Sequence, residues 1–93
     1  MRYFHDGALS LGRVDVPDDA DVQAFMDAPN AWWQPYSGEW REANRPDVQV
    51  EVLGPSAYLD RIPDSTVARV QAEIRARLGG RGSRLNPTKD ATA

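Results

Sequence analysis

Three tryptophans and a tyrosine are the residues of this chain best suited to binding chemistry. Trp32, Trp33, Tyr36 and Trp40 lie within nine positions, and the chain has no other tryptophan. An indole combines a large apolar area with one N–H donor, so such a cluster marks either the anchor of a core or a contact surface. Tryptophan is also enriched among the energetic hot spots of protein interfaces. We therefore assign Trp32, Trp33 and Tyr36 to partner binding, with at least one indole buried and at least one near the surface.

Two alternatives compete with that assignment. In the first, Trp33 and Trp40 fill the core between a sheet and its helices, and Trp32 covers it. In the second, the indoles stack on a sugar, although the segment lacks the run of polar partners that would accompany a sugar site.

Arginines in the last third of the chain provide the second candidate binding feature. Phosphate neutralisation favours such a run, and a glycine- and arginine-rich tail can follow a single nucleic-acid strand. The acidic body and the missing recognition-helix motif speak against nucleic acid. Docking on an acidic protein surface is the preferred interpretation, with Arg75, Arg81 and Arg84 as partner-binding residues. The full run is Arg69, Arg75, Arg77, Arg81 and Arg84.

Catalytic and metal-binding chemistry has little support. His5 is the only histidine, and no serine follows the Gly-x-Ser-x-Gly pattern of a nucleophile elbow. The chain has no cysteine, which excludes disulfides and thiolate metal sites. Four acids cluster at positions 15, 18, 19 and 21, but proline and alanine stand where a calcium loop needs a ligand and a glycine. We expect no enzyme, no metal, no cofactor and no small-molecule substrate.

Length and composition indicate one small domain of 93 residues, 41% of them hydrophobic. Ten arginines against one lysine indicate GC-rich coding, hence a high-GC bacterium or one of its phages. The N-terminus lacks the apolar region of a signal peptide, and no run reaches membrane-spanning length. The expected location is the cytoplasm, or a virion if the gene belongs to a phage.

Charge is distributed unevenly along the chain. Residues 1–64 hold twelve acids and five bases, a net charge of −7, whereas residues 65–93 hold two acids and six bases, a net charge of +4. An acidic body with a basic end can pair head to tail or meet two partners. The alternative is that these arginines are simply solvated.

The first half of the chain predicts a hairpin followed by a helix. Asp6-Gly7 favours a type I′ turn after a strand at residues 2–5. In the next strand, leucines 9 and 11 alternate out of phase with valines 14 and 16, which predicts a bulge at Gly12-Arg13. A helix capped by Asp18 follows and ends before Pro29, and residues 30–38 form a tryptophan-rich connection.

The second half predicts another hairpin and the strongest helix. Residues 38–43 and 48–53 are the expected strands, because Val48, Val50 and Val52 alternate with polar residues. Residues 56–62 form a short helical turn, and a helix runs from Asp64 to Leu78, where Gly79-Gly80 stops it. The predicted fold is α+β, in the order ββαββα: a four-stranded antiparallel sheet with two helices on one face. Residues 1–78 form the compact domain and residues 79–93 a flexible basic tail.

These observations lead to one expected function and one alternative. The expected function is a non-enzymatic protein–protein interaction or assembly module, a small accessory or structural protein that contacts a protein partner or itself through the tryptophan-rich loop and the basic end. The alternative is a small nucleic-acid-binding regulator that uses the arginine-rich helix and tail.

Overall fold

The computed structural model describes residues 1–85, with side chains described up to residue 79. It is an α+β fold with one antiparallel sheet of five strands and three α-helices. In chain order the elements are β1 (Arg2–His5), β2 (Leu11–Val14), α1 (Val22–Asp27), β3 (Asn30–Gln34), β4 (Glu39–Ala43), α2 (Asp47–Leu53), β5 (Asp60–Ile62), a 3-10 turn (Asp64–Thr66) and α3 (Val67–Leu85).

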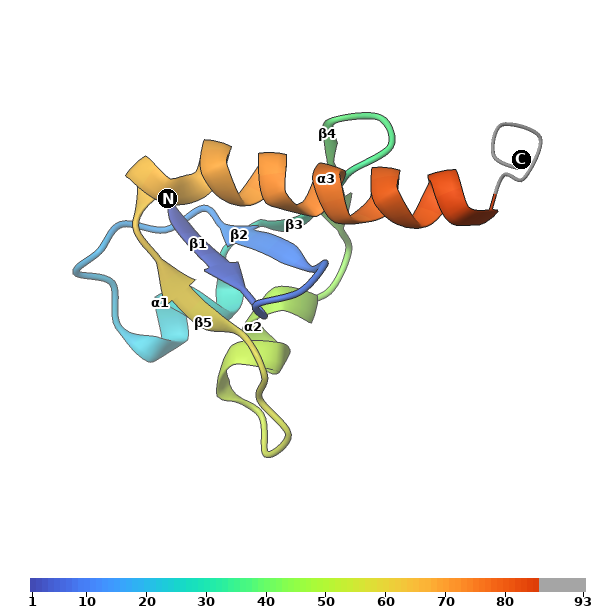
Figure 1. Ribbon diagram of the computed structural model, residues 1–93. Helices are drawn as coiled ribbons and strands as arrows, with labels where there is room; N and C mark the ends of the chain where they lie inside the picture. Colours follow the sequence, from blue (N-terminus) through green and yellow to red (C-terminus); the bar gives the residue numbers. More distant parts are fainter. Residues whose placement is uncertain (86–93) are drawn as a thin grey trace.

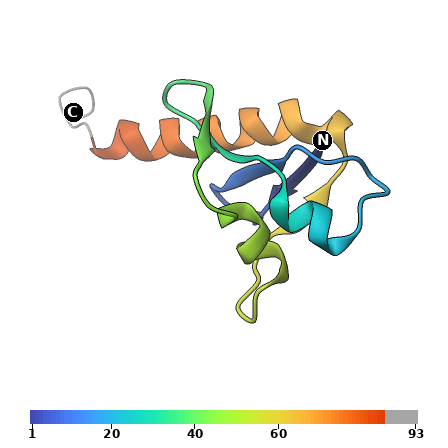
Figure 2. The same ribbon diagram turned by 180° about the vertical axis from the view of Figure 1, so that it is seen from behind.

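The sheet has helices on both of its faces. Its strands are ordered β4-β3-β2-β1-β5, with every pairing antiparallel. Helix α3 crosses one face, and α1 and α2 lie on the other, as Figures 1 and 2 show from opposite sides. The predicted placement of all helices on one face is therefore wrong.

The first hairpin forms without the predicted bulge and without a type I′ turn. Strands β1 and β2 pair in continuous register from Arg2↔Val14 to His5↔Leu11. Leu11 packs under α3, whereas Val14 packs under α1 and α2, so the change of phase in the sequence reflects two covered faces. In the loop, Asp6 Oδ1 accepts hydrogen bonds from the Ala8 and Ser10 N–H groups at 2.8 and 3.1 Å, and only Gly7 has a positive φ.

The second hairpin lies earlier in the chain than predicted. Residues 30–34 form β3, which pairs with β4 across a turn at residues 35–38, and Trp33 lies opposite Trp40. The tryptophan-rich segment is thus a strand next to the sheet's edge and not a connection. Gly38, with φ at +75°, allows the chain to reverse there.

The strand predicted at residues 48–53 is wrong, because residues 47–53 form helix α2. Val48 and Val52 are four residues apart and face the core together, whereas Val50 is 48% exposed. The buried Asn30 side chain fixes the start of this helix, because its Oδ1 accepts from the Val48 N–H and its Nδ2 donates to the Arg45 carbonyl. The buried Gln49 donates to the carbonyls of Phe25 and Ala28 and joins α2 to α1.

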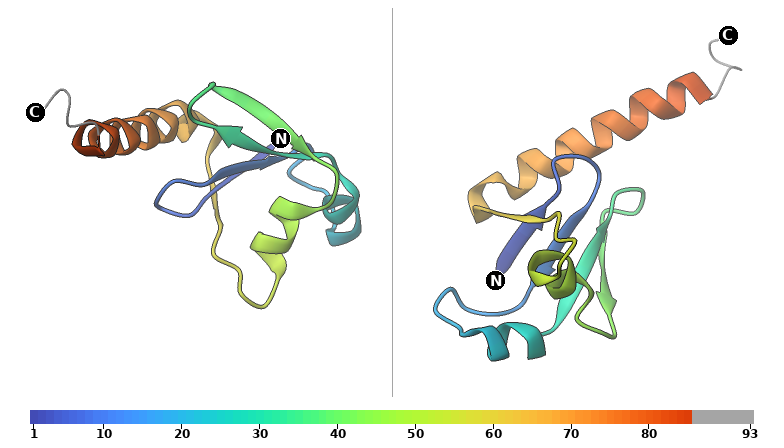
Figure 3. Two further views of the ribbon diagram at one scale, coloured as in Figure 1. Left: turned by 90° about the vertical axis from the view of Figure 1, so that its right-hand side faces the viewer. Right: turned by 90° about the horizontal axis from the view of Figure 1, so that it is seen from below.

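The remaining boundaries also differ from the prediction. The cap of α1 is Asp21, which accepts from the Ala24 N–H at 2.8 Å, and Asp18 lies outside the helix. The predicted helical turn at 56–62 ends instead in β5, the edge strand beside β1. Helix α3 continues through Gly79 and Gly80 to Leu85 and projects beyond the sheet (Figure 3). Residues 86–93 of the predicted tail lie outside the described residues.

The core agrees with most of the predicted apolar positions. Of the ten core positions that the sequence predicts, Val50 is exposed, three are half-buried (Leu9, Val52 and Val67) and six are buried (Leu11, Val14, Phe25, Val48, Val70 and Ile74). Five further apolar residues are buried that are not among these ten positions: Phe4, Val16, Ala31, Trp33 and Leu59. Within residues 1–85 no helix combines the length and apolar character needed to cross a membrane.

Candidate functional site

The turn between β3 and β4 and the middle of α3 together form an open hollow of about 230 Å³. Tyr36 stands at its edge and is 88% exposed, the highest fraction among the large apolar side chains of the described chain. We call this region the Tyr36 surface; it is lined by Pro35, Tyr36, Arg75, Leu78 and Gly79.

Arg75 is held in place at this surface by the sheet. Its guanidinium carbon lies 5.2 Å from the centre of the Trp33 ring, a cation–π contact. Its Nη2 lies so close to Gly38 that a Cβ added there would meet it at 2.7 Å. Among the described side chains, no carboxylate forms an ion pair with Arg75. The surface therefore offers a positioned cation beside exposed apolar area.

The three tryptophans occupy different environments. Trp33 is 4% exposed and packs with Leu11 and Ile74 between the sheet and α3. Trp40 is half-buried on the same face, where Arg13 lies 4.6 Å from its ring. Trp32 is half-buried on the opposite face, next to the α1 and α2 core.

The six predicted partner-binding residues thus do not form one surface. Tyr36 and Arg75 meet at the Tyr36 surface, with Trp33 directly behind Arg75. Trp32 belongs to the other side of the sheet. Residues 81 and 84 belong to the last turns of α3, beyond the part whose side chains are described. The sequence could not predict the contact between Arg75 and Trp33, because the two residues are far apart in the chain. A similar distance along the chain separates Arg75 from Tyr36.

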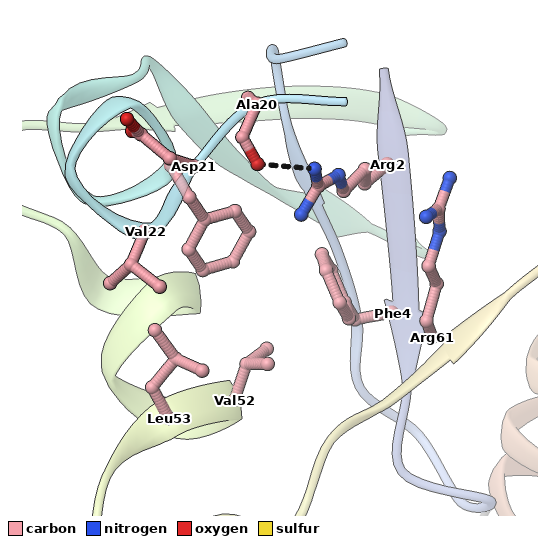
Figure 4. Close-up of a pocket in the computed structure, with 9 residues that line it drawn as sticks. Arg2, Phe4, Ala20, Asp21, Val22, Val52, Leu53 and Arg61 are labelled. Carbon is pink, nitrogen blue, oxygen red and sulfur yellow. Dashed lines mark hydrogen bonds between the residues drawn. The ribbon is translucent and has the colours of Figure 1, made fainter. Parts of the chain in front are cut away.

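A second hollow lies on the opposite side of the sheet and was not anticipated from the sequence. We call it the α1–α2 groove; it has a volume of about 130 Å³, and Phe25 is among the residues that line it. Figure 4 shows Phe4 and Val52 in the same lining. Val22 and Leu53 border it and are 66% and 53% exposed. The sequence predicts the apolar stripe of α1 but not the apolar side of α2, because the alternating valines of α2 are typical of a strand.

Charged residues surround the α1–α2 groove. Arg2 donates from its Nη2 to the carbonyls of Pro17, Asp18 and Ala20, which ties the segment before α1 to β1. Its Nε is buried and has no hydrogen-bond partner among the described residues. Arg61 pairs with Asp18, and this hydrogen bond and charge hold the pKa of the Asp18 carboxyl below its ordinary value.

The other residues that were considered for chemistry have structural contacts. His5 Nδ1 lies 2.9 Å from the Ser10 carbonyl oxygen, within the first hairpin. Of the acidic cluster before α1, Asp21 caps the helix and Asp18 pairs with Arg61. In the described part of the chain, no three His, Asp or Glu side chains are grouped so that they could hold a metal ion.

Comparisons of the chain with protein-family models, with curated proteins and with solved structures find no match.

Proposed function

We propose that this chain is a protein-interaction module and that the Tyr36 surface is its contact site. The observation that carries the proposal is the pairing of an 88% exposed tyrosine with an arginine held against a buried tryptophan. Tyrosine and arginine are enriched among interface hot spots, and an ordered side chain loses less entropy on binding. An interaction module of this size fits the assembly role expected from the sequence.

The chemistry of the surface indicates what it binds. Leu78 and Pro35 supply apolar contact, and Arg75 supplies a cation without a carboxylate partner among the described side chains. A protein segment with an apolar side chain next to a carboxylate satisfies both features. Arginine suits such a contact because its planar fork pairs with a carboxylate through two hydrogen bonds.

Photo-crosslinking tests this proposal. A photoreactive phenylalanine analogue replaces Tyr36 in the full chain, and the same analogue replaces Tyr58, a 47% exposed tyrosine elsewhere, as the control. We expect a discrete protein adduct from position 36 that is absent from position 58. Arg75→Ala should remove the adduct, whereas Arg69→Ala, which alters an arginine paired with Glu73, should retain it. Adducts with nucleic acid alone, or equal labelling at both positions, would overturn the proposal.

One observation favours nucleic-acid binding as a second candidate function. Helix α3 continues to Leu85, and positions 77, 81 and 84 fall on one face of a helix with 3.6 residues per turn. Three arginines in a row on a projecting helix could neutralise successive phosphates. Of these three, Arg77 also donates a hydrogen bond to the Gly7 carbonyl, so this candidate function depends mainly on positions 81 and 84.

A further inference from the structure

Strand β4 forms one edge of the sheet. It is the last strand in the order β4-β3-β2-β1-β5, and among the described residues only β3 pairs with it (Figure 3). Every second residue of an edge strand directs its backbone N–H and C=O groups away from the sheet, where another strand can pair with them. Proline, lysine and bulges commonly block such an edge, but β4 has none of them and its five residues pair with β3 without interruption. The β4 edge, residues 39–43, is therefore suited to the addition of a further strand.

The side chains of β4 divide between the two faces of the sheet. Glu39 and Arg41 are two positions apart and both exposed, and the pairing with β3 places them on the face that carries α1 and α2. Trp40 lies on the α3 face, where it is half-buried and Arg13 lies over its ring. Arg13 also pairs with Glu42 at 3.6 Å, which holds the guanidinium beside the indole. The edge thus presents an acid and a base on one face and an ordered aromatic ring on the other.

These side chains are complementary to a second copy of themselves in one register. When two β4 strands pair in antiparallel fashion, residues directly opposite each other lie on the same face of the sheet. With Trp40 opposite Trp40, each Glu39 lies opposite an Arg41, so the charges attract in both pairs and the two indoles meet. The neighbouring registers place Glu39 opposite Glu39 or Arg41 opposite Arg41, and like charges in that position destabilise the pair. The same three residues therefore favour self-association and fix its register.

The other edge strand, β5, lacks this property. It has three residues and is followed by Pro63, and its central Arg61 already pairs with Asp18. Antiparallel pairing of two β5 strands about their centre would place Arg61 opposite Arg61. The comparison indicates that β4, and not β5, is the edge that suits a second copy of the chain.

We propose that two copies of this chain associate through their β4 edges, with Trp40 opposite Trp40 and each Glu39 paired with Arg41 of the partner subunit. The contact is two-fold symmetric and joins the two sheets into one continuous sheet. Main-chain hydrogen bonds supply the affinity, and the side-chain pairs supply the specificity. This inference goes beyond the proposed function, because it uses a strand edge and not the Tyr36 surface.

Sedimentation velocity of the full chain over a wide range of concentration tests this contact. Glu39→Arg alone, or Arg41→Glu alone, places like charges opposite each other in both symmetric pairs, and both positions are exposed. We expect the natural chain to dimerise as concentration rises, and each single variant to dimerise at least about tenfold more weakly. The matched controls are Asp19→Arg and Arg69→Glu, which reverse charges at exposed positions away from β4 and should associate like the natural chain.

Mixing the two single variants gives the decisive measurement. In a mixed pair, position 39 of each copy lies opposite an unlike charge at position 41 of the other, so an equimolar mixture should dimerise although neither variant does so alone. The double variant, Glu39→Arg with Arg41→Glu, should dimerise like the natural chain. Because its net charge is unchanged, it separates pairing at the edge from general attraction between charged chains.

Three results would overturn the inference: a natural chain that stays monomeric, single variants that associate as well as the natural chain, or a mixture that associates no better than its components. The proposed function fails separately, because it depends on whether position 36 crosslinks to protein and on whether Arg75→Ala removes the adduct.

Discussion

Trp33 supports the Tyr36 surface from within the core. Its ring is almost fully buried beside Ile74 and also carries the guanidinium of Arg75 on its outer side. Removing it should therefore affect folding and binding together, whereas Tyr36 can be changed without opening the core. The two substitutions separate the structural role of the aromatic cluster from its contact role.

Trp33→Ala should lower the free energy of unfolding by about 3–5 kcal/mol, because it leaves a large cavity between the sheet and α3. Tyr36→Ala should change it by less than about 0.5 kcal/mol, as is usual for an exposed position. Urea denaturation followed by circular dichroism measures both. A Trp33→Ala loss below about 1 kcal/mol would show that α3 does not pack on the sheet as described.

Asp18 and Arg61 form an exposed ion pair that links the segment before α1 to β5. Because the pKa of Asp18 is lowered in the folded chain, its contribution to stability is present above the pKa of the unfolded chain. That contribution is lost as the pH falls through the lower, folded value. We expect Arg61→Ala to raise the pKa of Asp18, measured by NMR titration of its carboxyl carbon. Arg45→Ala is the control and should leave the titration unchanged.

At the scale of elements, the sequence predicted those strands and helices whose formation depends on residues close together in the chain. The first hairpin, the helix before Pro29 and the long helix with Val70 and Ile74 on one face all follow from local patterns. The α2 helix did not, because its alternating valines fit a strand as well as a helix. Tertiary contacts decide the outcome there, since Asn30 from β3 binds the first turn and Gln49 binds α1.

For a similar reason, the sequence did not predict that helices cover both faces of the sheet. The change of phase between Leu11 and Val14 is compatible with a bulge on a one-sided sheet and with a regular strand between two layers. Only the placement of α3 on the far face decides between them. The candidate site was predictable in its residue types, tyrosine and arginine, but the contact between Arg75 and Trp33 depends on the same placement.

Gly12 is the point at which α2 packs directly on the sheet. A Cβ added there would meet Val48 at 2.9 Å and Trp32 at 3.2 Å. Gly12→Ala should therefore destabilise the fold by about 1–3 kcal/mol through overpacking. Adding Val48→Ala should make the combined loss smaller than the sum of the two single losses, because the neighbours couple.

Gly79→Ala is the matched control for that substitution. Nothing lies within 4 Å of a Cβ added at position 79, and the residue is inside a helix. It should stabilise the helix by up to about 1 kcal/mol, as alanine is the better helix former. Equal effects of both substitutions on thermal unfolding would contradict the close packing of α2 on β2.

At the scale of the whole molecule, packing and charge are separated along the chain. The α3 residues of the core cluster are Val67, Val70, Ile74 and Leu78, and none of the described core lies beyond them. The segment that follows holds three glycines and two arginines in residues 79–85, a composition that contributes little to a helix on its own. We therefore expect the stability of the fold to depend mainly on residues before position 79.

Truncation after Leu78 should leave the thermal unfolding temperature nearly unchanged while weakening partner binding. The physical reason is that the last α3 residue packed against the described core is Leu78, so the removed segment takes little apolar contact with it. Calorimetry of the full and truncated chains measures the first effect. Unfolding of the truncated chain would place residues 79–93 within the core and move the domain boundary.

The response of binding to salt separates the two candidate functions. A contact through the Tyr36 surface depends on apolar area and one positioned arginine, so raising salt should weaken it only modestly. Binding of nucleic acid through the arginines of α3 releases counterions, and its affinity should fall steeply, roughly in proportion to the phosphates neutralised. Titrations of the full chain with a short DNA or RNA, repeated for Tyr36→Ala and for Arg77→Glu with Arg81→Glu, measure that slope. A steep slope that survives loss of Tyr36 and disappears with the two arginines would establish nucleic acid as the partner, because only the helix face would then contribute.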